Sequence, residues 1–325
     1  MLTIDGSRLE GGGQIVRTAV ALSALTGIPV ELLRIRENRK RPGLGNQHCA
    51  AVRAVAATCD ARVLGNSPGS RTLRFIPGAP RNTDIAVDVG TAGSVPLVIQ
   101  AWLPVALEHG GSIEVRGGTE VPKSPTIDYL TEVFIPALGP AAAHVTVAVS
   151  RRGYYPAGGG LVRVEVSPGE PGPLRIRPRG SSGIRSCSSG LPEHVADRQA
   201  AAAFSVISGA TGEKFPVTVD RANGPGKGSS CTVWKEARGS SALGRIGLPA
   251  EKVGEAAARG FLDEIHEGGE TDRYLGDQLL PYLGRYGGSY TCSQLTLHTR
   301  TVSWILDEFG FPVQTKVGHP AEFSA

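Results

Sequence analysis

The sequence predicts an α/β fold of the layered α+β kind, in which three β/α repeats pack together and a small α/β domain is inserted before the third. Three segments of the 325-residue chain share one order of elements, and the first helix of each ends at a glycine: Gly27, Gly110 and Gly287. The first two glycines are 83 residues apart (110 − 27) and the last two 177 (287 − 110). The second separation is longer than the first by the length of a small domain.

The first repeat begins with helical apolar spacing over residues 14–27 and continues with a strand, a Pro/Gly turn and a second helix. The predicted ranges are 30–36 for the strand, 41–46 for the turn and 47–59 for the helix, with closing strands at 61–65 and 71–77.

The second repeat follows the same order: helix 94–110, strand 112–118, turn 119–125, helix 126–138 and strands 144–150 and 161–167. The third consists of helix 271–288, strand 289–295, helix 298–310 and strand 312–317.

Residues 174–269 carry their own alternation of strands and helices and are flanked by segments rich in Pro and Gly. We therefore expect an inserted small domain at 174–269 and a large domain formed by 1–173 and 270–325.

Composition describes an ordinary globular chain, with 40% hydrophobic and 20% charged residues. The net charge of +4 permits a polyanionic partner without requiring one, although residues 34–41, RIRENRKR, hold five cations against one anion. The start has no signal-peptide pattern, and the longest apolar run, 95–107, is too short to span a bilayer. The five scattered cysteines indicate reduced thiols, so we expect a cytoplasmic protein without membrane partners.

A glycine triplet precedes the first helix in EGGGQIVR, residues 10–17. Glycines before a helix let backbone N–H groups approach a phosphate, but the stretch matches neither a Rossmann fingerprint nor a P-loop. Taken alone, it is better explained as a turn that needs a positive φ.

Polar residues gather at two places in each repeat, the start of the first helix and the junction before the second. If the repeats surround a common axis, these ends line one cleft suited to phosphates, a cation and a base. The residues concerned are Glu10, Arg17, Arg36, Arg39, Arg41, Gln47, Ser94, Gln100, Pro125, Tyr274, Asp277, Gln278 and His298.

Six ordered stretches together resemble the RNA 3′-terminal phosphate cyclase family: EGGGQIVRTA, RENRKRPGLGNQH, GTAGSVPLVIQ, GYYPAGGGLVRVEV, YLGDQLLPYL and LTLH. The resemblance covers essentially the whole chain. It implies three repeats similar to the C-terminal domain of translation initiation factor three, plus the insert. It also implies the reaction: ATP adenylylates a histidine, AMP passes to an RNA 3′-terminal phosphate, and the 2′-OH closes a 2′,3′-cyclic phosphate.

The resemblance implies a role for each matching residue. His298 would be the nucleophile, and Tyr274 and Pro125 would clamp the adenine. The other implied ATP contacts are Gln100, Leu275, Gly276, Asp277 and Gln278. Glu10 would hold Mg²⁺ or Mn²⁺, and the implied phosphate and RNA contacts are Arg17, Arg36, Arg39 and Gln47.

Two positions depart from the family pattern: Arg152 stands where a histidine is common, and HTRTVS at 298–303 lacks the usual Thr-Asn. Three alternatives stay open at this point: a non-cyclase ribosome-biogenesis relative, an enolpyruvyl transferase of similar repeats, and a non-catalytic RNA-binding protein. The sequence leaves undecided whether a homodimer forms, which RNA and metal are used, and whether 5′-phosphate ends accept AMP.

Overall fold

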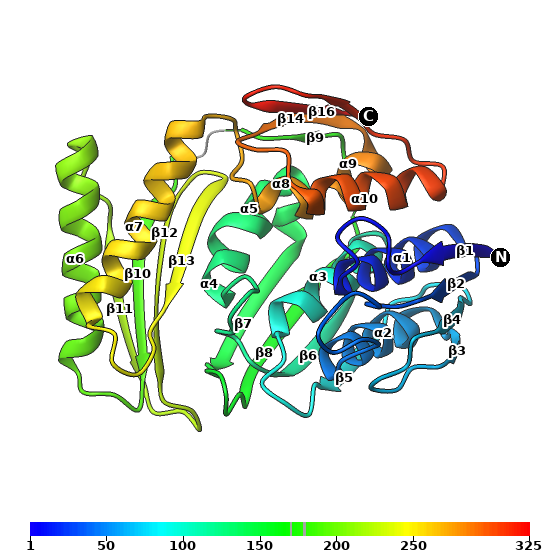
Figure 1. Cartoon of the computed structure of the whole chain (residues 1–325), viewed down its shortest axis with the longest axis horizontal. Coiled ribbons are helices and arrows are strands. Elements are labelled where there is room, and N and C mark those ends of the chain that lie inside the picture. The colour runs from blue at the N-terminus through cyan, green and yellow to red at the C-terminus, as the bar shows by residue number, and fades with distance from the viewer. Residues whose placement is uncertain (170, 178–179) are drawn as a thin grey trace.

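The computed structural model describes residues 1–169, 171–177 and 180–325. It contains four mixed four-stranded sheets with helices packed against them, which confirms the predicted α/β class. Figure 1 shows three of the sheets in a large body that carries both termini, and the fourth sheet at one side. No helix in the described residues is long and apolar enough to cross a membrane.

The three sheets of the body share one topology: the first strand is parallel to the second, the fourth is antiparallel to the second, and the third lies at the edge. The strands are β1 (Leu2–Asp5), β2 (Val30–Leu33), β3 (Arg62–Leu64) and β4 (Leu73–Ile76); β5 (Asp84–Asp88), β6 (Gly111–Gly117), β7 (Val145–Arg151) and β8 (Gly160–Val166); and β9 (Leu174–Arg175), β14 (Gly288–Cys292), β15 (Gln314–Lys316) and β16 (Ala321–Ser324).

Each unit opens with a strand that the sequence patterns did not indicate: β1, β5 and β9. These strands hold four, five and two residues, too few for a clear alternation, and parallel pairing with the next strand defines them. The insert thus lies between the first strand and first helix of the third unit. Because β9 pairs with β14, we propose a domain boundary just after Arg175 instead of at Leu174.

The helices of the body share one continuous hydrophobic core drawn from all three units. They are α1 (Gly13–Thr26), α2 (Asn46–Cys59), α3 (Val95–His109), α4 (Ile127–Tyr129), α5 (Ile135–Ala137), α8 (Leu275–Gln278), α9 (Leu280–Tyr286) and α10 (Leu297–Glu308). Two predicted continuous helices are interrupted. A π-helical turn at Leu130–Phe134 separates α4 from α5, and α9 restarts after α8 with Pro281 in its first turn, where a proline is tolerated.

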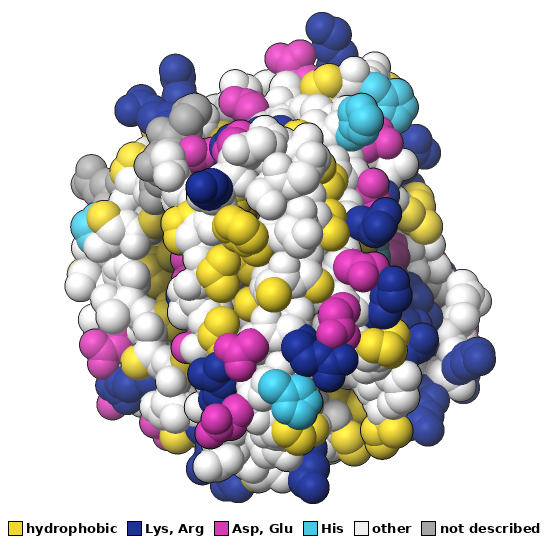
Figure 2. All heavy atoms as spheres, turned by 90° about the vertical axis from the view of Figure 1, so that its left-hand side faces the viewer, with side chains coloured by type: hydrophobic (Ala, Val, Ile, Leu, Met, Phe, Trp, Pro, Cys, Tyr) yellow, Lys and Arg dark blue, Asp and Glu magenta, His cyan; other side chains and the backbone are white. Residues whose placement is uncertain are grey.

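The insert has its own sheet, its own core and two helices on one sheet face. Its elements are β10 (Ser182–Ser189), α6 (His194–Thr211), β11 (Val217–Ala222), β12 (Gly228–Lys235), β13 (Arg238–Leu243) and α7 (Ala250–Glu267). Figure 2 looks onto this side of the molecule and shows basic and acidic side chains interspersed. Because side chains of both signs mix on this face (Figure 2), it has little net attraction for a polyanion. Within the insert, an ion pair between Arg198 and Glu251, 2.6 Å apart, joins α6 to α7.

Close helix packing in the insert depends on Gly254, because a Cβ there would overlap the Gln199 carbonyl of α6. We expect Gly254→Ala to lower the free energy of unfolding by about 1–3 kcal/mol, the usual cost of overpacking. Gly209→Ala is the matched control, since Gly209 lies in α6 with open space around it and alanine should stabilise by about 0.5–1 kcal/mol. Denaturant titration measures both; equal effects of the two variants would contradict the packing explanation.

Candidate active site

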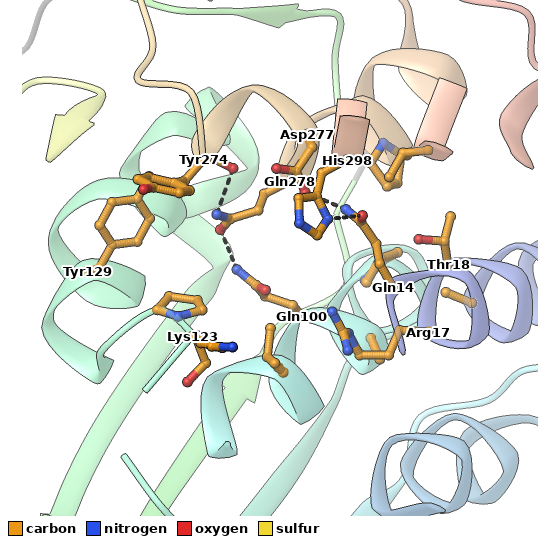
Figure 3. A pocket seen from close by; sticks show the side chains of 18 of the residues that line it. Gln14, Arg17, Thr18, Gln100, Lys123, Tyr129, Tyr274, Asp277, Gln278 and His298 are labelled. Atoms are coloured by element: carbon orange, nitrogen blue, oxygen red, sulfur yellow. Dashed lines mark hydrogen bonds between the residues drawn. The ribbon is translucent and has the colours of Figure 1, made fainter. Parts of the chain in front are cut away.

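A cavity of about 630 Å³ lies where the first helices of the three units meet (Figure 3). One part of its wall is polar and the rest, along α1 and α3, is apolar. The polar or clamp-forming side chains are Gln14, Arg17, Thr18, Gln100, Lys123, Ser124, Pro125, Tyr129, Tyr274, Asp277, Gln278 and His298, and β13 of the insert adds Gly239, Ser240 and Ser241. Seven residues expected at the site therefore line one cavity.

His298 lies in the first turn of α10, which begins in a capping box. The Thr296 side chain accepts a hydrogen bond from the Thr299 backbone N–H at 3.1 Å, and the Thr299 hydroxyl accepts from the Thr296 N–H at 2.7 Å. This local structure fixes the start of the helix, and Figure 3 shows the imidazole facing Gln14 in the cavity.

Gln14 sets the tautomer of His298. Its side-chain N–H donates to the Asp277 carboxylate, so its Oε1 faces His298 Nδ1, 2.8 Å away, as an acceptor. Nδ1 must then carry the proton, which leaves Nε2 with the lone pair. Within the described residues, Nε2 has no hydrogen-bond partner in the protein.

Burial and nearby cations keep the imidazole neutral. Burial lowers the pKa of His298 below its ordinary value, and the charges of Arg17 and Arg39 lower it further. Burial also raises the pKa of Asp277 to about 7, although the Gln14 hydrogen bond and Arg17 act in the opposite direction. Burial lowers the pKa of Arg17 to about 10, which leaves the guanidinium charged at neutral pH.

The glycine triplet makes room for two side chains. A Cβ on Gly12 would overlap the Glu10 carboxylate, and one on Gly13 would overlap the ring of His48. His48 is buried and neutral, since burial lowers its pKa to about 3, and its Nδ1 accepts the Gly45 N–H at 2.8 Å. The absence of side chains at Gly12 and Gly13 therefore lets the start of α1 pack against α2 and leaves space for the Glu10 carboxylate.

Glu10 is the residue expected to hold a metal ion. One carboxylate oxygen is ion-paired with Arg39, and the other, Oε2, is buried with no hydrogen-bond partner among the described residues. Such an oxygen fits a hard divalent cation. The described residues contain no cluster of three or more His, Cys, Asp or Glu that could hold a metal, so a bound phosphate would have to supply further ligands.

A chain of amides connects the second unit to the third. Gln100 of α3 donates to Gln278 at 2.5 Å, and Gln278 donates to the Tyr274 carbonyl at 2.7 Å (Figure 3). The Tyr274 ring remains 59% exposed at the cavity, which Pro125 also lines. An exposed aromatic ring beside a proline offers two flat surfaces to a base.

The other expected residues lie outside the cavity lining. Arg36 donates to the Gly43 carbonyl at 2.6 Å, and the Gln47 side chain accepts the Ser94 N–H at 3.1 Å. Leu275 is buried, and the Gly276 carbonyl accepts a hydrogen bond from the Tyr290 hydroxyl at 2.5 Å. These four residues are not part of the cavity lining, and their predicted ligand contacts stay predictions.

Sequence reasoning missed Gln14, Lys123, Tyr129 and the insert's Gly239, Ser240 and Ser241. A signal existed for Gln14, which lies three residues before Arg17 and so on the same helix face. The insert residues carry no such signal, because only domain packing brings β13 to the cavity.

Arg152, one of the two departures noted above, lies in a buried ionic cluster. It pairs with Glu120 and Asp128 at 2.7 Å each and reaches Asp220 of the insert at 3.6 Å. Because the arginine pairs with carboxyl groups of both the body and the insert, it links the two.

Comparison with known families decides the assignment. The family model described as RNA 3′-terminal phosphate cyclase matches residues 8–317. The chain belongs to this family. Three relatives with the same name come from Thermococcus kodakarensis (42% identity over 98% of this chain and 96% of the relative), Methanococcoides burtonii (41%, 95% and 94%) and Methanothermobacter thermautotrophicus (43%, 93% and 92%).

Membership confirms the resemblance drawn from the six sequence stretches, and the protein is an enzyme of the cyclase family. It rules out an enolpyruvyl transferase, and relatives named as cyclases argue against a non-catalytic RNA-binding protein.

The charge environment of His298 leads to a test by NMR titration of the imidazole. Removing a nearby cation should ease protonation, so Arg39→Gln is expected to raise the pKa of His298, while burial still holds it below that of a free histidine. Arg53→Gln, a solvent-facing arginine of α2, is the control and should leave it unmoved. An unchanged pKa of His298 in Arg39→Gln would show that the charge of Arg39 does not act on the imidazole.

Proposed function

We propose that this enzyme converts an RNA 3′-terminal phosphate to a 2′,3′-cyclic phosphate with ATP, through a covalent intermediate in which AMP is attached to His298. The observation that carries the proposal is the Gln14 bond to His298 Nδ1, which leaves the lone pair of Nε2 available in the cavity. A pKa below the ordinary value keeps the ring unprotonated near neutral pH.

In the first step, Nε2 attacks the α-phosphorus of ATP. A phosphorus–nitrogen bond forms, and the bond from that phosphorus to the bridging oxygen breaks, so that pyrophosphate leaves with the electron pair. Nδ1 keeps its proton, and the growing positive charge on the ring is stabilised by the Gln14 acceptor, itself held by Asp277. Arg17 and Arg39 would balance the charge of the phosphates.

Glu10 would hold the divalent cation on the phosphates, as its unpartnered buried oxygen suggests. Bound Mg²⁺ or Mn²⁺ supplies neutralisation of the leaving pyrophosphate. The base would lie between Tyr274 and Pro125, with Gln100, Gln278 and Asp277 along the same wall.

In the later steps, an oxygen of the RNA 3′-phosphate attacks the adenylate phosphorus and His298 leaves with its electron pair restored. The vicinal 2′-OH then attacks the RNA phosphorus, its proton is lost, and AMP departs. The ribose itself holds that hydroxyl beside the phosphorus, so this step needs little from the protein. A 2′-OH is present in RNA and absent from DNA, which defines the substrate class.

The expected setting is the cytoplasm, because all five cysteines are buried free thiols, as in a reducing compartment.

Covalent labelling tests the nucleophile. With α-³²P-ATP and Mg²⁺, wild-type protein should acquire an acid-labile, alkali-stable label, and His298→Ala should reduce it to background because the attacking nitrogen is gone. His144→Ala, at an exposed histidine far along the chain, should label like wild type. Unlabelled wild-type protein, or a labelled His298→Ala variant, would contradict the proposal.

The hydrogen bond between Gln14 and His298 leads to a separate prediction. Gln14→Leu removes the acceptor for Nδ1 and should slow labelling by about 10- to 100-fold, as is typical when a metal-bound histidine loses the partner that orients it. Gln314→Leu, at an exposed residue of β15, is the control. Single-turnover labelling rates measure both, and a wild-type rate for Gln14→Leu would show that Gln14 does not orient the ring.

A further inference from the structure

Asp272 connects three walls of the cavity through one carboxylate. It is fully buried in the segment that leads from the insert back into the body. Its Oδ1 accepts the backbone N–H groups of Tyr274 and Leu275, at 2.9 Å each, and its Oδ2 accepts the Gly239 N–H at 2.9 Å. The Tyr129 hydroxyl lies 2.8 Å from both oxygens.

The donors come from separate parts of the fold. Tyr274 and Leu275 begin α8, Tyr129 ends α4, and Gly239 belongs to β13 of the insert. Three of these four residues, Tyr274, Tyr129 and Gly239, line the cavity. Figure 3 shows Tyr129 and Tyr274 at the same end of it. A carboxylate that receives several N–H and O–H bonds in a buried place holds its donors in a fixed relation.

The insert is attached to the body at other points too. Arg152 links it through Asp220, and the Thr126 hydroxyl lies 3.2 Å from Thr232 and 3.0 Å from Ser241. Loss of the Asp272–Gly239 bond would therefore loosen β13 locally without releasing the insert.

We infer that Asp272 is a positioning residue that ties β13 of the insert to the Tyr274 side of the nucleotide site, so that ATP affinity depends on the insert. Asp272 touches no reacting atom; it acts through Tyr274, Tyr129 and Gly239. This inference rests on the proposed function, because it assigns the nucleoside to the cavity end that these residues form.

Asp272→Asn separates the two roles of the carboxylate. The amide oxygen should stay on the side where two N–H groups need an acceptor, which preserves the start of α8. The amide NH₂ then faces the Gly239 N–H, and two donors cannot bond. Tyr129 can rotate its hydroxyl to suit either group. The substitution thus breaks the link to the insert and keeps the helix cap, whereas Asp272→Ala removes both.

The test compares self-labelling of the full chain over a range of ATP concentrations. For Asp272→Asn we expect the KM for ATP to rise about tenfold, with the rate at saturating ATP reduced less than threefold. Asp5→Asn is the matched control, since Asp5 also accepts the N–H two residues on, at 3.0 Å, but does not line the cavity. It should keep the wild-type KM.

Hydrogen exchange supplies a readout that a general loss of stability would not reproduce. In Asp272→Asn the Gly239 amide should exchange at least tenfold faster while the Leu275 amide stays protected; in Asp272→Ala both should exchange faster. A wild-type KM together with fast exchange at Gly239 would overturn the inference, as would equal loosening at Gly239 and Leu275 in the Asn variant. Absence of label on wild-type protein would instead contradict the proposed function.

Discussion

The hydrogen-bond chain from Asp277 through Gln14 to His298 is the interaction on which the site depends. It crosses from α8 to α1 to α10 and so joins the first unit to the third. A glutamine can serve both ends because it donates with its nitrogen and accepts with its oxygen. The position of that one side chain determines which imidazole nitrogen keeps a lone pair, and it requires the three-unit body to be packed correctly.

Desolvation shifts the pKa values of the ionisable groups that line the cavity. The cavity shields His298, Asp277 and Arg17 only in part from water, and this desolvation lowers the pKa of His298 and Arg17 and raises the pKa of Asp277, which disfavours the charged form in each case. A neutral imidazole beside arginines is suited to receive a polyanion, because the cations attract phosphates and disfavour protonation of the nucleophile. The same residues that would bind substrate charge therefore also prepare the attacking group.

Repetition explains where the cavity is. Each unit places the start of its first helix near the common core. Helix α1 therefore contributes Gln14 and Arg17 to the cavity, α3 contributes Gln100, and α8 contributes Asp277 and Gln278. The insert interrupts the third unit between β9 and α8, and its return segment carries Asp272 directly into the site. A domain inserted there becomes one of the cavity walls.

The sequence alone predicted the repeats, the insert and a polar cleft, because glycine-terminated helices and clustered polar side chains are local signals: His298, Tyr274, Asp277 and Arg17 could all be named from it as candidates, and the four line one cavity. The short opening strands β1, β5 and β9, the tautomer set by Gln14 and the wall formed by Gly239 could not. Each of these depends on partners distant in the chain, 263 and 284 residues away for the two Gln14 bonds. Hydrogen bonds at such separations leave no periodic trace in a sequence, so only the tertiary structure decided them.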